Sequence, residues 1–161
     1  MQPPAHDDDR IALGQLGEQL AMEHLRSQGL IILDRNWRPQ RQAVRGELDL
    51  IARDGNFLVI VEVKTRRCLA YGSAIEAVTT RKMRTLRSLA LAWLEQRSIH
   101  APHLRFDVVA VTIPPAGQPV IEHMKAGPAR TIPCGSERAR YRGALRAARI
   151  GDSPMARHRP T

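Results

Sequence analysis

The sequence has little of what marks zinc-binding, secreted or membrane-spanning proteins. Its only two cysteines, Cys68 and Cys134, are isolated, and neither forms part of a C-x-x-C or Cys/His pattern that would predict a zinc site. No apolar run approaches the roughly 18 residues that suggest a membrane span. The first ten residues are polar and contain three aspartates, unlike a secretory signal. We therefore expect a reduced, cytoplasmic protein without a membrane partner.

Aromatic residues and negative charge are also scarce. Aromatic residues make up 4% of the chain, so stacking of single-stranded bases on a platform of rings is not the expected mode of binding. Lysine and arginine outnumber aspartate and glutamate by 25 to 16, for a net charge of +9. This excess favours a nucleic-acid partner recognised through its backbone and shape, so we expect branched or duplex DNA before any defined base sequence. Charge does not distinguish DNA from RNA; of the two we expect DNA.

The basic residues gather at the C-terminal end. From residue 130 onward there are eight arginines but only two acidic residues. Few large apolar residues accompany them, so we expect a basic, disordered tail over residues 129–161. We further expect a flexible N-terminus over residues 1–10 and one domain over residues 11–128, because 161 residues that are 43% hydrophobic support a single core.

The pattern of apolar residues predicts an α/β domain. Asp8 or Asp9 can cap a first helix that runs to about Gln28 and stops at Gly29. Its predicted core stripe is Leu13, Leu16, Leu20, Ala21 and Leu25. Further along, the sequence predicts a strand at 30–33, two central strands, a helix that begins at Thr79 or Thr80, a strand at 104–113 and a short edge strand at 120–123.

The two central strands carry unusual charges. Residues 46–51 (Gly-Glu-Leu-Asp-Leu-Ile) and 59–64 (Val-Ile-Val-Glu-Val-Lys) flank the turn residues Asp54-Gly55-Asn56, a pattern typical of a β-hairpin. A two-residue loop at 55–56 places Asp49 opposite Glu62, whereas a loop at 54–55 places Glu47 opposite Glu62. In either register Glu47, Asp49, Glu62 and Lys64 share one face; a three-residue loop would split them.

Such a set of charges is either a solvated strand face or a functional site. The opposite face (Leu48, Leu50, Val59, Val61, Val63) is continuously apolar, and the turn end of the charged face is apolar too. A sheet with this pattern is covered on both sides, so its charges need partners. Like charges opposite each other destabilise a sheet. A bound divalent cation would turn that repulsion into coordination, and this favours a site.

Several short blocks follow one another along the chain: Gly14-Gln-Leu-Gly-Glu18, Asn36-Trp-Arg38, Gly46-Glu-Leu-Asp49, Val61-Glu-Val-Lys-Thr-Arg66, Ala77-Val78 with Lys82, Arg105-Phe-Asp-Val-Val109 and Ile121-Glu-His123. Taken in this order, they resemble the YraN family of small bacterial proteins, which are predicted endonucleases. Asp49 followed by Glu62-Val63-Lys64 is similar to the core motif of the PD-(D/E)XK nucleases, particularly the branch that resembles Holliday-junction resolvases. The segment from Arg38 to Arg45 is a few residues longer than is usual in that family.

The resemblance implies a restriction-endonuclease-like core: a central mixed sheet of four to five strands flanked by helices, in the order helix, three strands, helix, strand. It also implies that the Val63 carbonyl completes a metal site, and by analogy that the protein forms a homodimer.

The charges themselves suggest metal-dependent phosphodiester hydrolysis. Oxygen ligands favour Mg²⁺ or Mn²⁺, and we expect Asp49 and Glu62 to be the ligands. Lys64, two residues from Glu62, would orient the attacking water or stabilise developing charge. Either Glu18, at the edge of the first helix's stripe, or Glu47 would support a ligand or a second metal. Contacts to phosphates are expected from Lys82, Arg66, Arg67 and Arg81.

Two other interpretations belong to different classes. A nucleic-acid-binding module could keep the nuclease fold with little catalytic turnover. A purely structural domain would leave the clustered carboxylates unexplained.

Overall fold

A computed structural model describes residues 7–40, 45–67, 80–99, 101 and 103–125. Within these residues the chain forms α1 (Asp7–Ser27), β1 (Ile31–Trp37), β2 (Leu48–Asp54), β3 (Phe57–Arg66), α2 (Thr80–Arg97), β4 (His103–Thr112) and β5 (Val120–Lys125). The predicted α/β class and order of elements are confirmed, although α1 begins at Asp7, inside the segment expected to be flexible. Both cysteines, Thr79 and the predicted tail lie outside the described residues.

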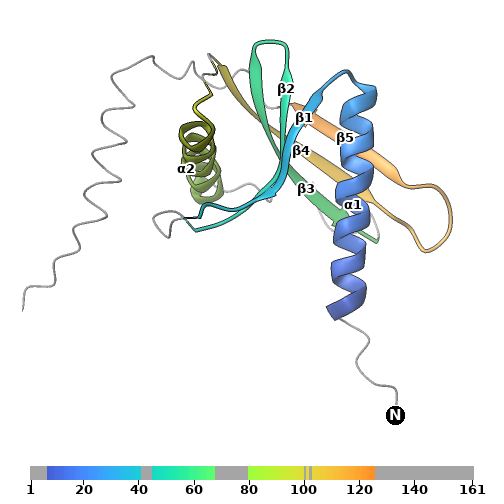
Figure 1. Cartoon of the computed structure of the whole chain (residues 1–161). Coiled ribbons are helices and arrows are strands. Elements are labelled where there is room, and N and C mark those ends of the chain that lie inside the picture. Colours follow the sequence, from blue (N-terminus) through green and yellow to red (C-terminus); the bar gives the residue numbers. More distant parts are fainter. Residues whose placement is uncertain (1–6, 41–44, 68–79, 100, 102, 126–161) are drawn as a thin grey trace, which may run out of the picture. The chain divides into compact units, whose positions relative to one another are not determined.

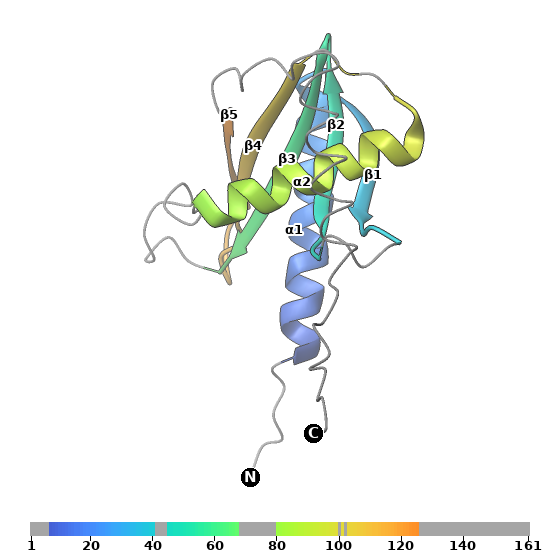
Figure 2. The same ribbon diagram turned by 90° about the vertical axis from the view of Figure 1, so that its left-hand side faces the viewer.

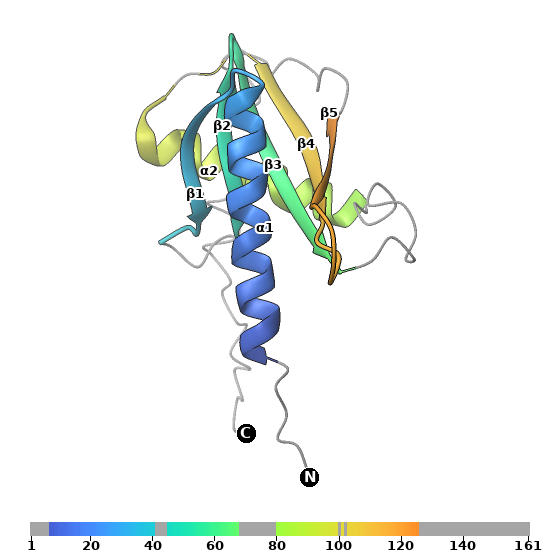
Figure 3. The same ribbon diagram turned by 90° about the vertical axis from the view of Figure 1, so that its right-hand side faces the viewer.

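The five strands form one mixed sheet in the order β1-β2-β3-β4-β5. The first three are antiparallel neighbours, β3 and β4 are parallel, and β4 and β5 are antiparallel. Parallel neighbours need a crossover connection, and α2 lies between β3 and β4 in the chain. Helices α1 and α2 lie on opposite faces of the sheet (Figure 1). Figure 2 shows α2 in front of the strands and Figure 3 shows α1 in front of them.

Helix α1 ends just before Gly29, the stop that the sequence predicts. This residue has a φ of +85°, a conformation that glycine adopts without steric cost. The Gly29 N–H donates to the Arg26 carbonyl at 2.9 Å, and the Leu30 N–H donates to the Leu25 carbonyl at 3.0 Å. This pair of bonds is the Schellman motif, and it turns the chain from α1 into β1.

The buried face of α1 differs in part from the predicted stripe. Ala21, Met22 and Leu25 pack on the sheet's apolar face, with Leu50, Ala52, Val59, Val61, Val109 and Val111. Leu16, predicted to lie in the core, is 47% exposed, and this prediction is wrong. The N-terminal part of α1 extends past the end of the sheet (Figure 3). Gly17, one position after Leu16, is the buried residue there, because the helix meets β3 at that position.

Gly17 allows α1 to approach β3 very closely. A Cβ atom at Gly17 would overlap the Thr65 side chain and would lie 2.8 Å from the Thr65 Cβ. We expect Gly17→Ala to lower the free energy of unfolding by roughly 2 kcal/mol, because Thr65 cannot rotate away and the helix must shift. Urea denaturation measures this change.

Gly14→Ala is the matched control. Gly14 lies one turn earlier in α1, and nothing comes within 4 Å of a Cβ built there. Alanine at Gly14 should raise the free energy of unfolding by about 0.5–1 kcal/mol, since it forms helix better than glycine. Equal effects at both positions would show that close packing at Gly17 is unimportant.

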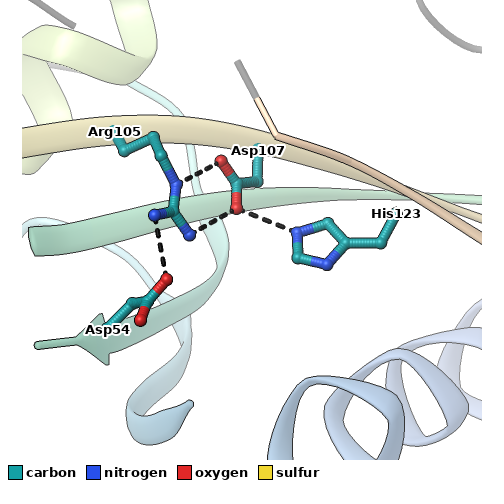
Figure 4. Close-up of polar contacts among 4 residues, drawn as sticks. All are labelled: Asp54, Arg105, Asp107 and His123. Carbon is teal, nitrogen blue, oxygen red and sulfur yellow. Dashed lines mark hydrogen bonds and ion pairs between the residues drawn. The ribbon is translucent and has the colours of Figure 1, made fainter. Parts of the chain in front are cut away.

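The face of the sheet under α1 also holds a buried network of charged side chains (Figure 4). Arg105 donates to both Asp107 oxygens, at 2.9 and 3.0 Å, and its Nη1 lies 2.9 Å from Asp54 Oδ2. Asp107 Oδ2 is also 2.9 Å from His123 Nε2, and the His123 ring lies edge-on to His24 of α1. The network ties β2, β4 and β5 together on the face opposite α2.

Candidate active site

The hairpin register puts Asp49 and Glu62 side by side. Asp54 pairs with Phe57 and Leu50 pairs with Val61, so the loop is Gly55-Asn56 and the alternative loop at 54–55 is excluded. Gly55 has a φ of +56°, which suits the first central position of a type II′ turn. One residue beyond the Leu50–Val61 pair, Asp49 is level with Glu62. Of the loops that the sequence left open, two of two residues and one of three, the structure has the one that sets Asp49 opposite Glu62.

Asp49 is fixed by the backbone of β3. Its Oδ2 accepts a hydrogen bond of 2.8 Å from the Val63 N–H, just past the last described β2–β3 pair. The carboxylate is thus held against the peptide that links Glu62 and Val63. This contact also brings the Asp49 carboxylate close to the part of the backbone that carries the predicted third ligand, the Val63 carbonyl.

Glu62 is almost fully buried, at 4% exposure, and its carboxylate forms ion pairs with two lysines. Its Oε1 lies 2.6 Å from Lys64 Nζ and 3.1 Å from Lys82 Nζ. Its Oε2 is buried and has no hydrogen-bond partner among the residues that the structure describes. A buried carboxylate oxygen without a partner is costly, so Oε2 is an acceptor atom on the charged face of the sheet that a hydrogen-bond donor or a cation would stabilise.

Burial and the neighbouring charges change the pKa of Asp49. Burial, followed by repulsion from Glu62, raises the pKa of Asp49 from 3.8 to about 6. The Val63 N–H, Lys82 and Lys64 act in the opposite direction but do not offset the burial. Near neutral pH the protein therefore resists the ionisation of Asp49 beside Glu62, an arrangement that a cation would relieve.

The two glutamates that were predicted to support the metal site form hydrogen bonds with other residues. Glu18 of α1 accepts a hydrogen bond of 3.0 Å from Asn36 Nδ2, and Glu47 accepts from Arg38 at 2.6 and 3.0 Å. In the described part of the chain, no three His, Cys, Asp or Glu side chains gather closely enough to hold a metal. The structure thus brings Asp49 and Glu62 together with Lys64, but it does not add Glu18 or Glu47 to that group.

The predicted phosphate-binding residues lie at the end of β3 and in the first turn of α2. Arg66 ends β3 and Arg67 follows it, while Arg81 and Lys82 stand in the first turn of α2. Arg67 and Arg81 are exposed. The contact of Lys82 with Glu62 is one that sequence reasoning missed, because it assigned Lys82 to phosphate alone. The sequence did contain a signal for this contact. The first turn of α2 has basic but no acidic residues, although acidic residues suit that end of a helix, so its lysine needs an acidic partner from another element.

Sequence comparisons agree on one family. The profile of the uncharacterised protein family UPF0102 matches residues 17–111. A UPF0102 protein of Rhodococcus opacus is 51% identical over 115 residues, which cover 71% of this chain and 94% of the relative. A UPF0102 protein of Renibacterium salmoninarum is 47% identical over 116 residues, covering 72% and 95%. One from Frankia alni is 50% identical over 115 residues, covering 71% and 92%.

The matched region contains both strands of the hairpin, the first turn of α2 and most of β4. None of these relatives' names states an activity. The chain belongs to the uncharacterised protein family UPF0102, the YraN group that its sequence motifs resemble.

Proposed function

We propose that this protein is a metal-dependent endonuclease that hydrolyses phosphodiester bonds of DNA, with branched or structured DNA as the favoured substrate. The observation that carries the proposal is the buried Glu62, whose Oε2 has no partner in the described part of the chain, beside an Asp49 whose pKa is raised to about 6. These two carboxylates offer hard oxygen ligands, and a divalent cation would stabilise their negative charge better than the protein alone does.

The donor set fits Mg²⁺ or Mn²⁺ held by Asp49, Glu62 and the Val63 carbonyl. When bound, such a cation would stabilise negative charge at the reacting phosphate and supply hydroxide near neutral pH. Lys64 would orient the attacking water or stabilise the charge that develops on the phosphate, since its ammonium group already lies 2.6 Å from Glu62. Either Glu18 or Glu47 would support this site.

Recognition would rest on charge and shape. Arg66, Arg67, Arg81 and Lys82 would contact phosphates beside the scissile bond, and the arginines beyond residue 130 would add contacts without reading bases. We propose cytoplasmic DNA as the partner and a homodimer as the assembly. None of the described helices is long and apolar enough to span a membrane.

One observation favours the alternative of a binding module with little turnover. Only two carboxylates meet at the site among the residues described, so metal affinity would depend on the backbone carbonyl and on water. The deciding experiment incubates the purified protein with Mn²⁺, Mg²⁺ or EDTA and linear, flapped and four-way DNAs, with single-stranded DNA and RNA for comparison. We expect metal-dependent cleavage that Asp49→Asn lacks. Binding without cleavage of any substrate would establish the module instead.

Asp49→Asn should make the metal-free protein more stable at pH 7.5, by roughly 1–3 kcal/mol. A carboxyl whose pKa rises from 3.8 in the unfolded chain to about 6 in the folded protein binds more protons when folded. Stability therefore falls as pH rises from about 4 to about 6, and at 1.36 kcal/mol per unit of pKa the full cost is roughly 3 kcal/mol. Asparagine carries no such cost and can still accept the Val63 N–H.

Chemical denaturation across pH 4–8, with and without millimolar Mn²⁺, measures both effects. Metal should stabilise the wild type, because a ligand that binds only the folded state shifts the equilibrium toward it, and it should leave Asp49→Asn unchanged. A metal response that survives in Asp49→Asn would remove Asp49 from the site.

A further inference from the structure

We propose that Lys82 is an internal counter-ion for Glu62 that metal binding displaces, so that its ammonium group becomes available to a substrate phosphate. This inference rests on the proposed metal-dependent function and assigns Lys82 a positioning role in it. The supporting observations concern how Glu62 is neutralised when no metal is bound.

Two ammonium groups converge on one oxygen of Glu62. Lys64 Nζ lies 2.6 Å and Lys82 Nζ 3.1 Å from Oε1, while no described residue is a hydrogen-bond partner of the buried Oε2. One lysine is enough to neutralise the single negative charge of Glu62. The second lysine also has Asp49 beside it, because both ammonium groups lower the pKa of the Asp49 carboxyl. Two carboxylates and two ammonium groups therefore form a set whose formal charges cancel.

A divalent cation would unbalance this set. Entry of a doubly charged ion between Asp49 and Glu62 would bring like charges close to both lysines, and such repulsion is strong where water is partly excluded. Lys64 is attached to β3 two residues from Glu62, so it stays beside the site. Lys82 is attached to α2 and is 39% exposed, so its side chain has room to turn toward solvent.

The position of Lys82 also indicates which anion its ammonium group would contact after it leaves Glu62. It stands in the first turn of α2, next to Arg81, and this turn has no acidic residue. Cations at a helix N-terminus are unfavourable unless an anion lies nearby. Glu62 is one such anion, with its Oε1 3.1 Å from the Lys82 ammonium group. With Glu62 committed to metal, a DNA phosphate is the anion that this end of the helix would take.

The first test measures Mn²⁺ binding by isothermal titration calorimetry without DNA. We expect Lys82→Met to bind Mn²⁺ roughly tenfold more tightly than wild type, because the competing ammonium group is gone. Lys82→Arg should bind like wild type. Arg84→Met removes a charge from an exposed residue of the same helix and should leave Mn²⁺ affinity unchanged. A residue with a merely structural role would weaken metal binding when replaced, or leave it unaltered.

The second test measures duplex DNA affinity in EDTA and in Ca²⁺, a hard oxygen-binding stand-in for the metal. In EDTA, Lys82→Met and wild type should bind DNA within about twofold, since Lys82 is then engaged with Glu62. In Ca²⁺ the variant should bind several-fold more weakly, and its log–log salt slope should be shallower by about 0.9, the loss of one phosphate contact.

The outcomes separate this proposal from the proposed function. If wild type binds Mn²⁺ and Lys82→Met binds it no more tightly, the counter-ion role is overturned while the metal site stands. Equal losses of DNA affinity in EDTA and Ca²⁺ would likewise overturn the displacement. If wild type and every Lys82 variant bind no Mn²⁺, the metal-dependent function itself fails, and the inference fails with it.

Discussion

Lys64→Ala should lower the rate of DNA cleavage by at least about a hundredfold while DNA affinity stays within a few-fold. The Lys64 ammonium group lies 2.6 Å from Glu62 Oε1, on the strand that carries the proposed metal ligands. A positioned proton donor or charge at a reacting group contributes roughly 10²–10⁴ to the rate. Because that contribution arises in the transition state, its loss should appear in single-turnover rates measured at saturating protein.

Metal binding gives this prediction an internal check. Removal of a positive charge beside Glu62 should leave Mn²⁺ affinity equal to or higher than that of wild type, so the inactive variant is not simply empty of metal. Circular dichroism and the Mn²⁺-induced stabilisation would show that the site still forms. A variant that cleaves at the wild-type rate would exclude Lys64 from the chemistry.

Arg67→Ala is the matched control, with the opposite phenotype expected. Arg67 is an exposed residue just after β3, close to Lys64 in sequence but without a proposed role at the reacting phosphate. Its replacement should weaken binding and reduce the salt slope by about 0.9, with little change in the cleavage rate at saturation. Loss of cleavage in both variants would indicate a general effect of positive charge.

Asp107→Asn should destabilise the fold by about 3–5 kcal/mol. The Asp107 side chain is 0% exposed and meets Arg105 and His123 in the network of Figure 4. Removal of one partner of a buried ion pair leaves the other charge without full compensation, which costs this much in typical cases. Domains have only about 5–15 kcal/mol of stability in total, so urea denaturation should show a large shift of the midpoint.

Arg38→Ala provides the comparison at a surface pair. Arg38 and Glu47 approach within 2.6 Å, closer than Arg105 and Asp107, but the Arg38 side chain is 74% exposed. Exposed ion pairs contribute between 0 and about 1 kcal/mol, so this substitution should change stability little. If both variants lose similar stability, burial does not govern the strength of these pairs.

The sequence by itself determined the features that depend on near neighbours. With a two-residue loop at the turn around Gly55, the two-residue periodicity of the strands predicted that Asp49 and Glu62 share a face. The observed register was one of the few that this turn allows. Gly29 predicted the end of α1 in the same way. In each case the physical cause, a backbone conformation or the pleat of a strand, lies within a few residues.

Only the tertiary structure decided the features that depend on how the helices pack. Lys82 reaches Glu62 because the crossover between β3 and β4 places the first turn of α2 beside the end of β3. Gly17 is buried, and Leu16 exposed, because α1 meets the sheet at Thr65. The raised pKa of Asp49 follows mainly from burial. Periodicity gives the direction of a side chain from its own element, but the partner it meets is set by packing between elements distant in sequence.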